Sequence, residues 1–321
     1  MSVLVFAELD NGSIKKSSLE AIYYGSEVAK AKGTSTTVLA IGESNSDALA
    51  IAGKFGANKV LWASDARLNS ASIQAYSSVL AEAVGATSAE FIILAKSSLG
   101  DAVSARVSAK LKASIVSNVV DLPDFSNGVT VKRSIYTGKA FASVVLTADK
   151  KVIAIKKNAV NVVEGDGSAS VESFAPALND ADFAVKVTGT HKASGQVSLP
   201  EADLVVSAGR GLKGPENWGI VEDLATALGA ATACSKPVSD LDWRPHHEHV
   251  GQTGIKVSPN LYIACGISGA IQHLAGVNSS KVIVVINKDP EAPFFKAADY
   301  GIVGDVFDVL PRLTKAIQAS K

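Results

Sequence analysis

The first hundred residues alternate between short apolar runs and longer stretches with helical spacing. The apolar runs predict β-strands at 3–7, 37–41, 59–62 and 91–94, and the intervening stretches predict helices at 17–32, 47–54, 70–85 and 99–111. Strands that alternate with helices are typical of a parallel sheet with helices packed against it. We therefore expect a doubly wound α/β domain at the N-terminus.

The pattern changes between residues 115 and 195. Up to about residue 163, segments rich in Val, Ile and Thr are broken by turn dipeptides such as Asn127-Gly128, which favour antiparallel strands or hairpins. Residues 165–195 lack helical spacing, apart from one candidate strand at 183–187, and are typical of a linker. We interpret the strands as an extension of the first domain and expect the domains to be residues 1–195 and 196–321.

A second alternation of strands and helices fills the C-terminal part. It predicts strands at 202–207, 231–234, 261–265, 281–286 and 301–303, and helices at 215–228, 268–274, 293–298 and 306–319. This is the pattern of a second doubly wound, Rossmann-like domain. In such sheets ligands bind beyond the carboxyl ends of the strands, so the loops that follow the strands should converge there.

Composition narrows the class of protein. The chain is 47% hydrophobic, and its 31 Lys and Arg residues balance its 31 Asp and Glu residues, so no net field favours nucleic acid. No apolar run approaches the ~20 residues of a membrane helix, and a strand follows Met1 almost directly, which favours a cytoplasmic protein without membrane insertion. Two widely separated cysteines, Cys234 and Cys265, are interpreted as small buried hydrophobic residues in a reducing compartment.

Three groups of loop residues carry candidate chemistry. Residues 209–214 have the G-x-G-x-x-G spacing between a strand and a helix, but the next strand ends without the acid that holds a nicotinamide ribose. This favours a dinucleotide other than NAD, the alternative being a structural turn with a solvated Arg210. Residues 250–254 and 265–276 combine glycines, hydroxyls, amides and His273, so backbone can approach a planar polar ligand closely. The helix start near Ser268 and Gly269 offers N–H groups to a phosphate.

Other candidate residues allow two interpretations. His273 can face a ligand, or it can be a buried histidine whose ring is hydrogen-bonded within the core. Asn287 can bond an adenine edge or form the turn before Asp289-Pro290, and Asp305 can bond a ribose hydroxyl or cap the last helix. Three histidines crowd residues 246–249, but their spacing differs from that of a zinc helix, so no metal site is expected. A solvated or partner-facing loop, or a ligand-facing His249, remains open there.

The segments Gly-Arg-Gly-Leu-Lys, Val-Gly-Gln-Thr-Gly and Ile-Ser-Gly-Ala-Ile-Gln-His-Leu-Ala-Gly closely resemble the alpha subunits of electron-transfer flavoproteins, most densely from residue 207 onward. The resemblance implies an electron carrier without a substrate reaction of its own. It implies a heterodimer whose beta subunit carries AMP, with one non-covalent FAD bound mainly by the C-terminal domain. Electrons would come from flavin dehydrogenases, such as the acyl-CoA dehydrogenases of fatty acid β-oxidation, and pass to a membrane quinone oxidoreductase.

Carried over onto this sequence, the resemblance assigns Gln252 and Thr253 to the flavin ring, with the Thr hydroxyl near N5. Arg210 and His273 would stabilise the negative charge of an anionic semiquinone, and Asn287 and Asp305 would hold the adenosine end. The cofactor-binding residues expected are Arg210, Ser235, Val250, Gly251, Gln252, Thr253, Ser268, Gly269, Ala270, Ile271, Gln272, His273, Asn287, Asp305 and Val306.

Two positions depart from the family pattern. Lys236 stands where the family usually has Arg, and an ammonium does not stack as a guanidinium does. His249 stands where the family often has Gln, so this loop is expected to titrate near neutral pH. Two other functions stay open: a FAD- or NAD-dependent oxidoreductase with its own substrate, and an adenosine-nucleotide-binding module without redox chemistry.

Overall fold

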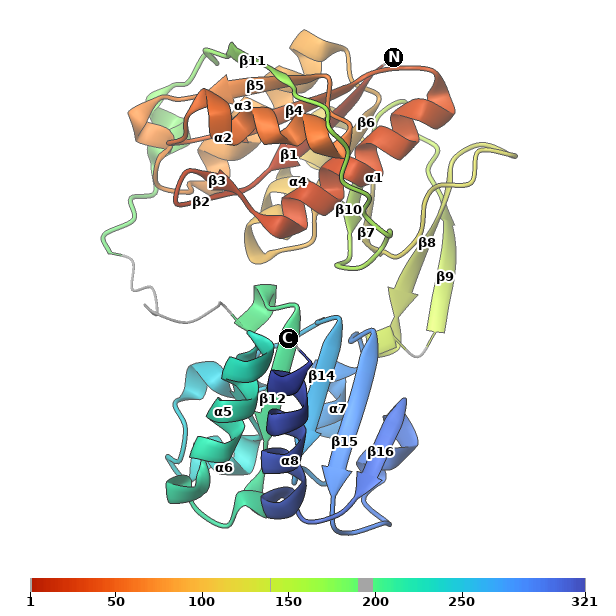
Figure 1. The fold of residues 1–321 in the computed structure, drawn as a ribbon. Helices are drawn as coiled ribbons and strands as arrows, with labels where there is room; N and C mark the ends of the chain where they lie inside the picture. Colours follow the sequence, from red (N-terminus) through yellow and green to blue (C-terminus); the bar gives the residue numbers. More distant parts are fainter. Residues whose placement is uncertain (1, 139, 190–198, 321) are drawn as a thin grey trace. The chain divides into compact units, whose positions relative to one another are not determined.

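The computed structural model describes residues 2–138, 140–189 and 199–320 (Figure 1). The chain divides into two compact units, residues 1–190 and 191–321, each with its own α/β sheet. The domain boundary expected between residues 195 and 196 lies outside the described residues.

The first unit is built on a nine-stranded sheet in the order β11-β5-β4-β1-β6-β10-β7-β8-β9. Its strands are β1 (Val3–Ala7), β4 (Thr36–Ile41), β5 (Lys59–Ala63), β6 (Phe91–Ala95), β7 (Ser114–Val119), β8 (Thr130–Ile135), β9 (Ala140–Val145), β10 (Lys151–Ile155) and β11 (Ser170–Ser173). A small hairpin of β2 (Leu9–Asp10) and β3 (Ser13–Ile14) follows β1.

Helices cover both faces of this sheet. They are α1 (Lys16–Lys32), α2 (Ser46–Ala50), α3 (Ile73–Thr87) and α4 (Ser98–Leu111). Val3, Val5 and Ala7 point to the core that contains α1, whereas Leu4 and Phe6 point to the core under α3 and α4. Strands apolar on both faces are typical of a buried parallel sheet, and the doubly wound fold expected from the sequence is confirmed.

The antiparallel extension is only partly as expected. Strands β8 and β9 form an antiparallel hairpin whose outer strand leaves Phe141 and Val145 more than half exposed. Strand β10, however, lies between β6 and β7 and is parallel to both, so the antiparallel prediction is wrong for it. The reason lies in its residues: all five of β10 are buried, which suits the centre of a parallel sheet rather than a half-solvated hairpin.

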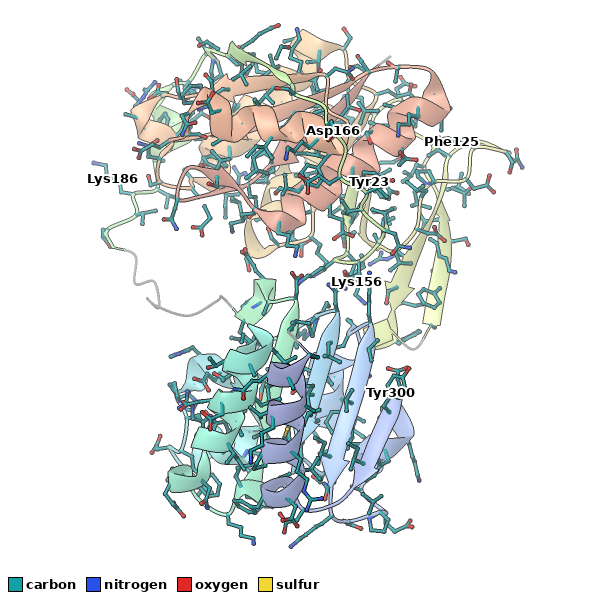
Figure 2. All side chains as sticks on the ribbon, in the orientation of Figure 1. Tyr23, Phe125, Lys156, Asp166, Lys186 and Tyr300 are labelled. Atoms are coloured by element: carbon teal, nitrogen blue, oxygen red, sulfur yellow. The ribbon has the colours of Figure 1, made fainter. Side chains whose placement is uncertain are left out.

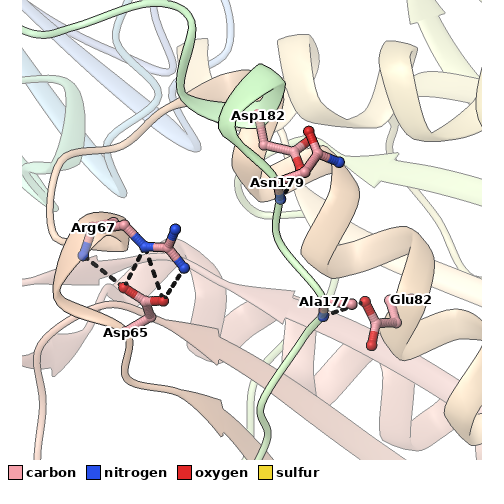
Figure 3. A network of polar contacts seen from close by, with 6 residues as sticks. All are labelled: Asp65, Arg67, Glu82, Ala177, Asn179 and Asp182. Atoms are coloured by element: carbon pink, nitrogen blue, oxygen red, sulfur yellow. Dashed lines mark hydrogen bonds and ion pairs between the residues drawn. The ribbon is translucent and has the colours of Figure 1, made fainter.

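The segment expected to be a linker belongs largely to the first unit. Strand β11 pairs in parallel with the edge strand β5. Residues 174–184, here called the strap, then run over α3 (Figure 3). The Ala177 N–H donates to Glu82 at 2.9 Å, and the Asp182 carboxylate accepts from Ser78 at 2.6 Å and from the Asn179 N–H at 3.0 Å. The strand expected at 183–187 is wrong, because Phe183 ends a 3₁₀ turn that begins at Asp180.

At the carboxyl edge of the first sheet, the strand order reverses between β1 and β6. The buried carboxylate of Glu8 follows β1 there. It accepts a hydrogen bond from Ser97, the residue that caps the amino end of α4, and it pairs with Lys15 at 3.3 Å. Side chains of the unit itself therefore occupy the position where such sheets bind ligands.

The second unit has a five-stranded parallel sheet in the order β13-β12-β14-β15-β16. Its strands are β12 (Leu204–Ala208), β13 (Ala231–Cys234), β14 (Leu261–Cys265), β15 (Val282–Asn287) and β16 (Tyr300–Val303). Its helices are α5 (Gly219–Leu228), α6 (Lys236–Asp240), α7 (Ile271–Val277) and α8 (Val306–Ala319). The edge strand β16 is exposed throughout, and Tyr300, labelled in Figure 2, is 67% exposed.

Two cores flank this second sheet. On one face of the sheet, Val206 and Ile263 pack in the core beneath α5 and α8. On the other face, Tyr262 and Val285 pack in the core beneath α7. Cys234 and Cys265 are buried at strand ends, and burial raises the pKa of both thiols to about 12, as expected of small core residues. The strand order reverses between β12 and β14, so the loops after these two strands flank the predicted ligand position.

The contacts of the strap predict that loss of the Asp182 carboxylate destabilises this segment locally. Replacing Asp182 by Ala removes the acceptor for both Ser78 and the Asn179 N–H, a loss of about 1–2 kcal/mol of local stability. Hydrogen exchange in residues 174–184 should become faster, while exchange in β6 should not change. Asp180→Ala, an exposed change in the same turn, is the control, and equal exchange in both variants would contradict this role for Asp182.

Candidate functional site

Two glycine turns meet at the carboxyl edge of the second sheet. A Cβ atom on Gly211 would lie 2.7 Å from the Gly266 Cα atom, and one on Gly209 would lie 2.5 Å from the Gly266 carbonyl oxygen. Gly266 also has a φ angle of +60°. The Gly211 N–H donates to the Gly266 carbonyl at 3.1 Å. The G-x-G-x-x-G spacing thus serves to pack the loop after β12 directly on the loop after β14.

Arg210 stands between these glycines at the start of a 3₁₀ turn. Its side chain is exposed and makes no hydrogen bond or ion pair with any other described residue. Ser235 is buried beside it at the end of β13, where its N–H donates to the Ala208 carbonyl at 3.1 Å. Lys236, one of the two departures from the family pattern, forms an exposed ion pair with Asp240 at 2.9 Å. Arg210 is therefore the cation of this group that is available to a ligand.

The two most informative sequence segments lie against each other. The Gln252 N–H donates to the Gln272 carbonyl at 2.7 Å, and a Cβ atom on Gly276 of α7 would lie 2.6 Å from the Gly251 nitrogen. The predicted residues of these segments that are exposed are Gln252, Thr253, Ser268, Ala270, Ile271 and Gln272. Those that are buried are Val250, Gly251, Gly269 and His273. Amide, hydroxyl and apolar groups therefore share one accessible surface above buried backbone.

His273 lies on the inner side of α7. Its Nε2 atom is 2.9 Å from the Tyr262 hydroxyl, and its ring packs edge-on against Phe294. Burial, assisted by the nearby His249, lowers the pKa of His273 to about 4. The Val250 carbonyl offsets part of this lowering, although no acceptor among the described residues meets hydrogen-bond geometry at Nδ1. Burial therefore favours the neutral ring at neutral pH, and a role of His273 toward the flavin stays a prediction.

Asn287, Asp305 and Val306 lie together in a shallow depression. It is lined by Gly211, Lys213, Gly266, Asn287, Lys288, Asp305 and Val306. The Asn287 amide donates to the Ile267 carbonyl at 3.0 Å and accepts from the Asp289 N–H at 3.0 Å. Asp305 accepts from the Phe307 N–H and caps α8. Both side chains therefore have the structural role that the sequence left open, and both also border the depression.

Two lysines of the depression were missed by the sequence analysis. Lys213 has a φ angle of +65° and its ammonium lies 4.9 Å from the centre of the Phe307 ring, while Lys288 directly follows the predicted Asn287. Their positions in the sequence, in the loops that follow β12 and β15, could have indicated that they lie at this edge of the sheet. Two lysines in the lining of this depression suit a ligand with negative groups such as phosphates.

The histidine-rich loop is organised by ordinary polar contacts. His246 Nδ1 is 2.7 Å from the Ser239 hydroxyl, and the buried Glu248 pairs with Arg244 at 2.6 Å. His247 is exposed and His249 is buried. Within the part of the chain that the structure describes, no group of three or more His, Cys, Asp or Glu side chains could hold a metal ion.

Comparisons with known proteins cover both units. Residues 3–179 match the model of the electron transfer flavoprotein domain. Residues 198–278 match the model of the electron transfer flavoprotein FAD-binding domain. The second match includes the two glycine turns, the loop of residues 250–254 and all of α7.

Relatives that match nearly the whole chain are named as alpha subunits of electron transfer flavoproteins. The chain is 39% identical over 315 residues to "Electron transfer flavoprotein subunit alpha" of Bacillus subtilis, covering 98% of this chain and 96% of that protein. It is 39% identical over 328 residues to the protein of the same name from Pseudomonas aeruginosa, covering 99% and 100%. A probable mitochondrial alpha subunit from Caenorhabditis elegans is 36% identical over 318 residues, covering 98% and 93%.

The burial of His273 predicts how stability depends on pH. Because its pKa is about 4 in the folded chain and about 6.5 when exposed, the unfolded state binds the proton more tightly. The free energy of unfolding of the second unit should therefore fall as pH decreases from about 6.5 to about 4, with a slope of up to about 1.4 kcal/mol per pH unit from this group. Urea unfolding at several pH values measures the slope, and His273→Gln should reduce it. An unchanged slope in that variant would contradict the neutral, buried ring.

Proposed function

The chain belongs to the electron-transfer flavoprotein family as an alpha subunit, and we propose that its second unit binds one FAD non-covalently at the carboxyl edge of the second sheet. One observation carries the location: the loop of residues 250–254 lies against α7 and leaves Gln252, Thr253 and Gln272 exposed. Two further features support a planar cofactor at this site. Glycine turns keep side chains away from the loops, and the exposed Ile271 gives a planar ring an apolar contact.

In this proposal the site has two ends. Gln252 and Thr253 hold the flavin ring, with the Thr253 hydroxyl at N5, and the exposed Arg210 lies near its pyrimidine side. Residues Ser268 to Gln272 line the cofactor, supported by Ser235, Val250 and Gly251. Asn287, Asp305 and Val306 hold the adenosine end, and the ammonium groups of Lys213 and Lys288 support binding of the diphosphate there.

The bound flavin supplies the redox chemistry, so the task of the chain is to hold it and set its potential. We propose a heterodimer with a beta subunit that carries AMP. It accepts electrons from flavin dehydrogenases, such as acyl-CoA dehydrogenases, and delivers them to a membrane quinone oxidoreductase. Among the described residues no helix is long and apolar enough to cross a membrane. We place the carrier in the bacterial cytoplasm, a location that the free, buried cysteines support.

The proposal is tested by producing the full chain together with its beta subunit. We expect a yellow heterodimer that contains one FAD and one AMP, counted after extraction by chromatography and absorbance. Two flavins per heterodimer would contradict simple carriage. A colourless preparation that binds only adenosine phosphates would contradict redox function, and turnover of acyl thioesters by the heterodimer alone would favour an oxidoreductase with its own substrate.

Arg210 should set the first reduction potential of the bound flavin. A guanidinium beside the pyrimidine side stabilises the negative charge that the first electron adds, so Arg210→Ala should lower this potential by on the order of 50 mV. Spectroelectrochemical titration of the heterodimer measures it. Arg312→Ala, the same change at an exposed site on α8, should leave the potential unchanged. Equal potentials in the Arg210 variant and the wild type would remove Arg210 from this role.

A further inference from the structure

The ring of His249 fills the inside of the turn that presents Gln252 and Thr253. Its Nδ1 atom lies 2.7 Å from the position of a Cβ atom on Gly254, and its Nε2 atom lies 3.3 Å from the position of one on Gly251. The backbone of His249 closes the same turn, because its carbonyl accepts from the Ile255 N–H at 2.8 Å. The side chain is only 7% exposed. The turn is therefore wrapped around an imidazole.

The surroundings of this ring favour its uncharged form. No described residue forms a hydrogen bond with its nitrogens. The titratable groups that act on it are Lys236 and Asp240 of α6, His246 of the preceding 3₁₀ turn and His273 of α7. Asp240 is the only anion among these four, and it is already paired with Lys236. A proton on His249 would therefore find no unpaired anion among these groups, and burial and the charge of Lys236 disfavour it.

We propose that His249 is a positioning residue for the FAD site: its neutral ring holds the loop of residues 250–254 closed, and protonation opens the loop and weakens binding of the cofactor. This inference rests on the proposed function. It concerns only the loop that carries Gln252 and Thr253, since Gly211, Asn287 and Asp305 border the site independently of His249.

The direction of the pH effect follows from the difference in the pKa of His249 between the closed and the open loop. Burial, followed by the charge of Lys236, lowers the pKa of His249 in the closed loop below 6.5. The open loop exposes the ring and binds the proton more tightly, so the closed loop has its full stability above about pH 6.5 and loses it as the pH falls. FAD, which binds the closed loop, should bind more weakly at acid pH.

The binding test compares three forms of the full chain, each produced with its beta subunit. The dissociation constant of FAD is measured at pH 8 and pH 5.5 for the wild type, for His249→Gln and for His247→Gln. The last is the matched control, because His247 is exposed in the same segment. In the wild type and the control the constant should rise at least roughly threefold at pH 5.5. In His249→Gln it should change much less, and an equal rise in all three forms would overturn the proposal.

A second measurement does not depend on FAD. Hydrogen exchange in residues 251–255 of the flavin-free preparations is compared between the wild type and His249→Gln at the same pH. The wild type should exchange faster than the variant at pH 5.5 and equally at pH 8, and β14 should be equally protected in both, which verifies folding. Identical loop exchange at both pH values would overturn the proposal. If the loop exchanges as expected but none of the three forms binds FAD, the result would contradict the proposed function and not the effect of His249 on the loop.

Discussion

At the carboxyl edge of the second sheet, segments of the chain are held together by direct contacts between the main chains of glycines. Gly211 lies on Gly266, and farther along the chain Gly276 of α7 lies on Gly251. A methyl group at any of these contacts would separate two loops, because the neighbouring atoms are main chain and cannot rotate away. Main-chain contacts thus bring together the segments that carry Gln252, Thr253 and Gln272, and the side chains of these three residues stay exposed.

Local periodicity was enough to predict most of the fold, but not the strands whose partners are distant in sequence. The apolar run of β10 marks a strand without revealing its direction, which is fixed by insertion between β6 and β7. Strand β11 is short and partly polar, and the strap contains a Pro and several polar residues, as linkers do, but the two segments contact β5 and α3. Their order comes from tertiary pairing rather than from local preference.

Residue chemistry marked the candidate site in the sequence, but it did not indicate how the side chains are oriented. Glycines, amides and hydroxyls after strands mark a ligand loop, which the family match to residues 198–278 supports. The sequence did not indicate which face of α7 is buried. His273, Gly276 and Val277 form the inner stripe, whereas the larger apolar Ile271 is 72% exposed. Because the Tyr262 hydroxyl lies within this core, the imidazole of His273 has a hydrogen-bond partner there for its Nε2 atom.

The pairing of Glu8 with Ser97 and Lys15 gives the first unit a property that the second lacks. A helix start beside a strand-order reversal attracts anions, and here the anion is tethered to the same chain. A tethered group acts at a high effective concentration, so a free phosphate would have to compete with a carboxylate that never diffuses away. The two sheets thus differ at the carboxyl edge: in the first, a carboxylate of the chain itself lies at the helix start, and in the second, Gln252, Thr253 and Gln272 are exposed.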